Sequence, residues 1–90
     1  MKIARRFVVT GRVQGVGFRW FTRDAASREG VNGYVMNRAD GSVEAFVEGD
    51  SEAVARVERI IRAGPPAARV KTVDVIEEEA SGAYRTFSMK

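Results

Sequence analysis

The sequence contains no cysteine and no histidine. Without cysteine the chain can form no disulfide and offers no thiolate nucleophile. Without histidine it lacks the commonest general base and the commonest side-chain ligand of transition metals. Any catalysis must therefore proceed without a Ser–His, Cys–His or His-metal site, and we expect no metal and no cofactor. A reducing compartment is compatible with this composition, and we expect the protein to be cytoplasmic.

Long apolar segments are also missing. No run approaches the roughly 20 residues that a membrane span needs, and the basic residues 1–6 are not followed by the apolar region of a signal peptide. We therefore expect no membrane partner. The net charge of +3, from 15 basic and 12 acidic residues, mildly favours anionic partners but is too small to argue for nucleic acid, which we do not expect as a partner.

What is present is a chain of 90 residues with an ordinary globular composition. This length predicts one domain, residues 1–90, and we expect a monomer. A domain of this size buries roughly 60–65% of its unfolded surface, which is enough for one modest core.

Apolar periodicity predicts alternating strands and helices. We expect strands over residues 3–13, 31–38, 43–48 and 68–77, with a hairpin turn at 39–42 and a polar turn at 78–83. Helices are predicted from Arg19 to Glu29, and from a cap at Asp50 or Ser51 to Gly64. Residues 84–89 can add a short last strand. This β-α-β-β-α-β order predicts an α+β, ferredoxin-like two-layer sandwich, with two helices on one face of an antiparallel sheet.

A few residues depart from these patterns. Phe46 falls on the outward parity of its strand, where it can cover a sheet edge or contact the C-terminal segment. Glu48 shares that parity and is expected to face water. Val70 is out of step with its strand, which indicates a bulge or an ambiguous register. Trp20 lies off the apolar stripe of its helix, so we expect a partly exposed ring packed on a neighbouring segment, with a wall beside a substrate as the alternative.

A glycine-rich turn joins the first strand to the first helix. Gly15 and Gly17 allow positive φ, so the backbone can curl and aim several N–H groups at one point beside a helix N-terminus. Arg19 adds a planar fork of donors suited to phosphate or carboxylate oxygens. The turn lacks the Gly-Lys-Ser/Thr of a Walker loop, and Trp20 replaces the third glycine of a dinucleotide fingerprint. A plain turn with a solvated arginine stays the alternative.

Two longer patterns carry a family resemblance. Residues 11–19 read Gly-Arg-Val-Gln-Gly-Val-Gly-Phe-Arg, and residues 33–37 read Gly-Tyr-Val-Met-Asn, followed at the expected spacing by Gly41, Val43 and Gly49. Together they resemble the acylphosphatase family over nearly the whole chain, with a looser match at the C-terminal segment.

The resemblance implies a ferredoxin-like enzyme that hydrolyses acyl phosphates without a metal and without a covalent enzyme intermediate. It implies Arg19 as the catalytic arginine and Asn37 as the residue that orients the attacking water. The phosphate cradle falls on Gln14, Gly15, Val16, Gly17, Phe18 and Arg19. A small acyl phosphate is the expected partner, with phosphate or sulfate as a product-like ligand.

Other interpretations remain for particular residues. Asn37 can be a strand-end turn former, Arg12 and Arg38 can be solvated or can steer an anion, and residues 77–79 are expected to be a solvated acidic run. At the level of function, a ferredoxin-like sheet can bind RNA through aromatic side chains, although the third strand is acidic. Domains of this family also begin larger carbamoyl-transferring proteins, and we expect the short chain to favour the stand-alone enzyme.

Overall fold

Two helices and five strands follow one another in the computed structural model, which describes residues 1–90. Their order is β1 (Lys2–Arg12), α1 (Phe18–Glu29), β2 (Asn32–Asn37), β3 (Val43–Asp50), α2 (Ser51–Ala63), β4 (Arg69–Glu78) and β5 (Phe87–Met89). The predicted elements are all present, with ends that differ by a few residues. Neither helix has the length and apolar character needed to cross a membrane.

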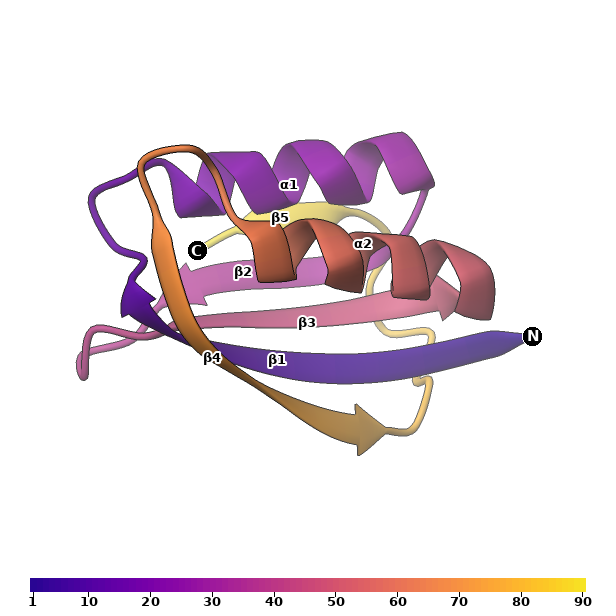
Figure 1. Cartoon of the computed structure of the whole chain (residues 1–90). Helices are drawn as coiled ribbons and strands as arrows, with labels where there is room; N and C mark the ends of the chain where they lie inside the picture. Colours follow the sequence, from indigo (N-terminus) through magenta and orange to yellow (C-terminus); the bar gives the residue numbers. More distant parts are fainter.

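The strands form a single sheet in the order β4-β1-β3-β2-β5. β1 pairs antiparallel with β3 and β4, and β2 pairs antiparallel with β3. Both helices lie on one face of this sheet (Figure 1). The predicted ferredoxin-like sandwich is therefore confirmed with one correction. β5 pairs parallel with β2, so the sheet is mixed, because residues 79–86 carry the chain back to the edge beyond β2.

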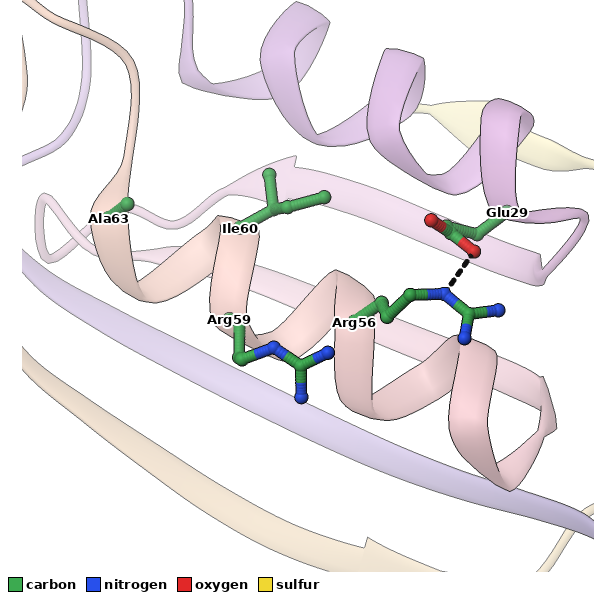
Figure 2. A pocket seen from close by; sticks show the side chains of 5 residues that line it. All are labelled: Glu29, Arg56, Arg59, Ile60 and Ala63. Carbon is green, nitrogen blue, oxygen red and sulfur yellow. Dashed lines mark hydrogen bonds and ion pairs between the residues drawn. The ribbon is translucent and has the colours of Figure 1, made fainter.

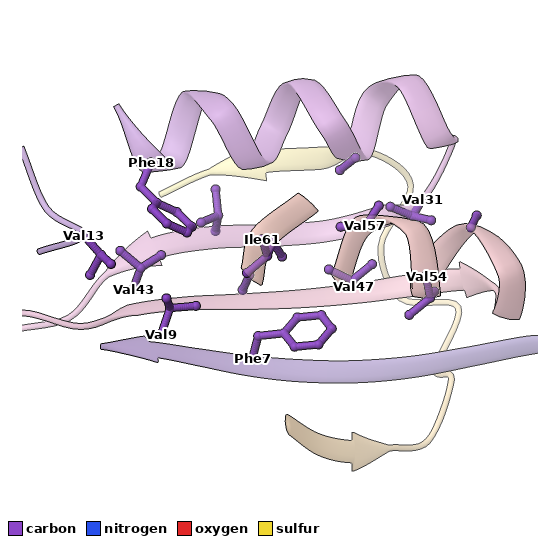
Figure 3. Packing of buried hydrophobic residues seen from close by; sticks show 14 residues of the cluster. Phe7, Val9, Val13, Phe18, Val31, Val43, Val47, Val54, Val57 and Ile61 are labelled. Atoms are coloured by element: carbon purple, nitrogen blue, oxygen red, sulfur yellow. The ribbon is translucent and has the colours of Figure 1, made fainter. Parts of the chain in front are cut away.

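The core fills the space between the helices and the sheet (Figure 3). Phe7 and Val9 of β1 face Ile61, Val57 and neighbouring residues of α2, and all four side chains are fully buried. Burying a side chain of this size stabilises the fold by about 1.5–3 kcal/mol. Because Val13 and Phe18 belong to the same cluster, the turn between β1 and α1 is anchored to the core at both ends.

A bulge shapes the end of β1 next to that turn. Thr10 pairs with Thr72 but Gly11 pairs with Val70, so Lys71 is the extra residue in β4. A Cβ on Gly11 would lie 2.1 Å from the carbonyl oxygen of Arg69, so only glycine fits this close approach. The irregularity expected around Val70 is confirmed, and it lies directly before the glycine-rich turn.

The open face of the sheet is partly covered by residues 79–86. Phe46 is 8% exposed and its ring centre lies 5.2 Å from that of Tyr84, so the expected contact with the C-terminal segment is confirmed. Glu48 was expected to face water, but its side chain is only 5% exposed. Its carboxylate accepts hydrogen bonds from the main-chain N–H groups of Ser81 and Gly82 at 2.7 and 2.8 Å. Strand parity could not predict this cover, because the cover comes from a segment without apolar periodicity.

Candidate active site

The turn between β1 and α1 has a row of main-chain N–H groups without protein partners. The first closed hydrogen bond of α1 runs from the N–H of Phe21 to the carbonyl of Gly17 at 3.0 Å, and no turn or loop bond involves the N–H groups of residues 15–20. Gly15 and Gly17 have φ values of 74° and 80°, which curl the backbone at this point. Free amides at the positive end of a helix dipole favour an anion here.

A pocket of about 150 Å³ opens at this turn. Arg19 and Asn37, which come from α1 and β2, both line it. The structure thus brings the two residues with predicted catalytic roles to one cavity. The complete lining is Val13, Gly15, Gly17, Phe18, Arg19, Trp20 and Asn37. Of the predicted phosphate-binding residues, Gln14 and Val16 do not line it.

The side chain of Gln14 is hydrogen-bonded to the protein main chain. Its Nε2 donates to the carbonyl oxygens of Arg38 and Ser42 at 2.7 and 2.9 Å. These carbonyls belong to the β2–β3 turn, directly after Asn37. The side chain therefore fastens the glycine-rich turn to the strand end that carries Asn37, and only the main chain of Gln14 remains for an anion.

The guanidinium of Arg19 is held from the far end of the chain. Its Nη1 donates to the carbonyl oxygen of Lys90 at 2.9 Å, and the N–H of Lys90 donates to the carbonyl of Val35 in β2 at 2.9 Å. In Figure 1 the C-terminus lies beside the start of α1, as these bonds require. Sequence patterns do not reveal this role of Lys90, because a main-chain carbonyl leaves no signal in a sequence. The other guanidinium N–H groups make no protein hydrogen bond.

Asn37 ends β2 opposite Val43 of β3. Its side chain is half-buried and makes no hydrogen bond within the protein. The turn after it is closed by a bond from the N–H of Arg38 to the carbonyl of Ser42 at 2.8 Å. The main-chain N–H of Ser42 donates to the carboxylate of Asp40 at 2.9 Å, and the hydrogen bonds from Ser42 lower the pKa of Asp40. Asn37 thus has a firm backbone and a free carboxamide.

Trp20 is 54% exposed and also lines the pocket. The partly exposed ring that the sequence predicts is confirmed. Its neighbour is Arg23, whose guanidinium carbon lies 4.4 Å from the ring centre.

No aspartate or glutamate side chain lines the pocket. Glu77 and Glu78 are not a purely solvated run, because they pair with Arg5 and Arg6 at 2.9 and 2.6 Å across the β1–β4 edge. The pairing register of β1 and β4, which a single sequence does not reveal, places Arg5 opposite Glu77 and Arg6 diagonal to Glu78. The side chains around the pocket are thus apolar, neutral or positive, which favours an anionic ligand.

A larger hollow of about 370 Å³ lies between α1 and α2 (Figure 2). It is lined by Glu29, Arg56, Arg59, Ile60 and Ala63. The Nε of Arg56 pairs with Glu29 at 2.7 Å, which offsets one of the two positive charges. Arg56, Arg59 and Ile60 lie within α2 rather than at a helix start, so this hollow offers no cluster of free amides. It is the poorer candidate for a phosphoryl group.

Comparisons with known proteins agree on one family. The acylphosphatase family model matches residues 5–89. An acylphosphatase from Rubrobacter xylanophilus is 52% identical over 85 residues, which are 94% of this chain and 77% of the relative. One from Thermotoga petrophila is 49% identical over 87 residues, 97% of this chain and 96% of the relative.

Solved structures give the same result. The crystal structure of an acylphosphatase from Bacillus subtilis superposes with a TM-score of 0.94 at 35% identity and covers 98% of both chains. A full-length HypF in a phosphate- and nucleotide-bound form gives a TM-score of 0.91 at 30% identity, but the match covers all of this chain and 12% of that one. By sequence and by structure, this chain belongs to the acylphosphatase family.

Proposed function

We propose that this acylphosphatase hydrolyses the carboxyl-phosphate anhydride bond of small acyl phosphates to a carboxylate and inorganic phosphate, with Arg19 and Asn37 as its catalytic residues and no metal. One observation carries the assignment of residues. Arg19 and Asn37 line the same pocket as the glycine-rich turn, whose main-chain amides have no protein partners.

In this proposal the phosphoryl group lies against the turn. The main-chain N–H groups of residues 14–19 donate to its oxygens, and the guanidinium of Arg19 adds charge-assisted hydrogen bonds. Phosphoryl transfer depends chiefly on positioning and on stabilising charge at the equatorial oxygens, and both are supplied by fixed donors. The contact with Lys90 keeps the guanidinium in place before the substrate arrives.

Asn37 orients the attacking water. A carboxamide can accept a hydrogen bond from water through its oxygen and donate one through its nitrogen. The water oxygen forms a bond to phosphorus, the bond from phosphorus to the bridging oxygen breaks, and the carboxylate leaves with the electron pair. Both protons of the water stay on the phosphate product, which forms as dihydrogen phosphate. Because a carboxylate is a weakly basic leaving group, the reaction needs no general acid, which suits a chain without histidine.

The test is phosphate release from acetyl and benzoyl phosphate by wild-type protein, Arg19→Ala and Asn37→Ala. Each substitution is expected to lower kcat by about 10²–10³, as the loss of one transition-state donor does. Arg12→Ala, which removes an exposed arginine outside the pocket, is the matched control and keeps its turnover. Circular dichroism checks that each variant is folded. Full turnover in Asn37→Ala would show that the water is oriented otherwise.

A second candidate is a domain that handles carbamoyl phosphate within a longer protein. The match to a small part of full-length HypF shows that similar domains occur inside larger chains. Comparing kcat/KM for carbamoyl and acetyl phosphate separates the two. We also propose a monomeric, cytoplasmic enzyme that binds phosphate or sulfate as a product-like ligand.

A further inference from the structure

We infer that Trp20 selects the acyl group of the substrate, and that its indole ring favours flat aromatic acyl groups of the benzoyl type over small aliphatic ones. This inference rests on the proposed function, because it requires the phosphoryl group to lie in the pocket formed by the glycine-rich turn.

The position of the phosphoryl group decides where the acyl group lies. In the proposed complex the phosphoryl group lies against the main-chain amides of the glycine-rich turn, inside a small pocket of about 150 Å³. The acyl group is attached through the bridging oxygen, so it extends from the turn toward the mouth of this pocket.

The exposed fractions of the lining side chains identify what the acyl group meets there. Val13 and Phe18 are 1% and 2% exposed, so they form the floor. Trp20 is 54% exposed and is the large apolar side chain that lines the pocket and also reaches solvent. The acyl group of a bound substrate that extends out of the pocket beside Trp20 would cover part of the indole ring that is now exposed to water.

Arg23 determines how that ring is presented. Its guanidinium lies over one face of the indole and makes no ion pair with a carboxylate. The cation covers this face and restrains the ring, which leaves the opposite face and the edge for a ligand. A planar benzoyl group can stack on such a surface, whereas the methyl group of an acetyl substrate covers little of it.

Kinetics on two substrates test the inference. We expect wild-type protein to prefer benzoyl over acetyl phosphate, and the ratio of the two kcat/KM values to fall about tenfold in Trp20→Ala. Trp20→Phe keeps a flat ring and should keep the ratio within about threefold of wild type. Val75→Ala is the matched control, because Val75 is an exposed apolar residue of β4 outside the pocket, and its ratio should equal that of wild type.

Binding of unreactive analogues tests the same contact without turnover. In phenacylphosphonate and acetonylphosphonate a methylene group replaces the bridging oxygen of benzoyl and acetyl phosphate. Trp20 is the one tryptophan of the chain, so its fluorescence reports directly on the pocket mouth. Phenacylphosphonate is expected to quench it and to bind about tenfold more tightly than acetonylphosphonate. Inorganic phosphate serves as the reference without an acyl group.

The outcomes separate this inference from the proposed function. If wild-type protein hydrolyses acyl phosphates but Trp20→Ala leaves the substrate ratio unchanged, the selection by Trp20 is refuted and the hydrolysis stands. A parallel loss on both substrates also refutes it, because Trp20 would then not distinguish between the two acyl groups. If wild-type protein hydrolyses neither substrate, the proposed function fails, and equal affinity for the two phosphonates would then refute the recognition by Trp20 as well.

Discussion

Gln14, Arg19 and Asn37 differ in how far the sequence alone could place them. Arg19 and Asn37 belong to two motif patterns in register, so their presence at one pocket was predictable. The side-chain bonds of Gln14 were not, because they connect it to main-chain carbonyls of residues 38 and 42, which carry no mark in the sequence. The same limit applies to the carbonyl of Lys90 that holds Arg19. The catalytic assignments of Arg19 and Asn37 stay predictions.

Replacing Gln14 tests its fastening role. Gln14→Met keeps the size of the side chain but removes both hydrogen bonds, each worth about 1 kcal/mol. We expect the free energy of unfolding to fall by about 1–2 kcal/mol and kcat to fall with it, because the turn is no longer tied to the strand end that carries Asn37. Urea unfolding and phosphate release are the measurements. An unchanged urea midpoint together with unchanged kcat would show that these bonds do not hold the site.

The strands and helices were predictable because apolar residues recur along each of them with the period of a strand or of a helix. The segment between β4 and β5 was not predictable. Residues 79–86 have neither period, yet they cover the open face of the sheet and deliver β5 to the edge of β2. Their anchor is Glu48 on β3. Strand parity gave the direction of this side chain correctly, but solvent exposure could not be read from parity.

Because the carboxylate of Glu48 holds this segment, the free energy of unfolding should depend on the protonation of Glu48 and therefore on pH. Burial alone raises the pKa of Glu48, but the hydrogen bonds from the main chain of Ser81 and Gly82 and from the Ser81 hydroxyl outweigh it, so the pKa lies below its usual value. A carboxyl with a lowered pKa in the folded state stabilises the fold above its unfolded pKa of about 4.3. That contribution is lost as the pH falls through the lower, folded pKa.

Glu48→Gln is therefore expected to lower the free energy of unfolding by about 2 kcal/mol near neutral pH. The deficit relative to wild type should be constant above about pH 5 and should shrink as the pH falls below about 4, because the unfolded wild-type chain then binds a proton at Glu48 while the folded chain, with its lowered pKa, still resists protonation. Urea unfolding at several pH values measures it. Glu79→Gln is the control, because Glu79 is an exposed carboxylate of the same covering segment and makes no hydrogen bond. A deficit that did not change with pH would mean that the charge of Glu48 is not what holds the segment.

Over the whole molecule, one core connects elements that are distant in the sequence. The buried cluster draws side chains from β1, α1, β2, β3 and α2, and its members face one another between the two layers (Figure 3). The layers and the helix positions were predictable from the alternation of elements. The parallel pairing of β5 was not, because it depends on the path of the covering segment.

This shared core predicts that residues 1–90 unfold as one domain. Fluorescence of Trp20 follows α1, and far-ultraviolet circular dichroism follows the whole backbone. The two signals should give the same urea midpoint and the same slope, as two-state domains of this size do. Separate transitions would mean that the chain contains two units rather than one.

A crystal structure of the protein soaked with phosphate is the sharpest test of the proposed anion site. We predict a tetrahedral anion in the 150 Å³ pocket, bound by the main-chain amides of the glycine-rich turn and by the guanidinium of Arg19, with the carboxamide of Asn37 facing it. An empty pocket under saturating phosphate, or an anion bound elsewhere while Arg19 and Asn37 stay unoccupied, would contradict it.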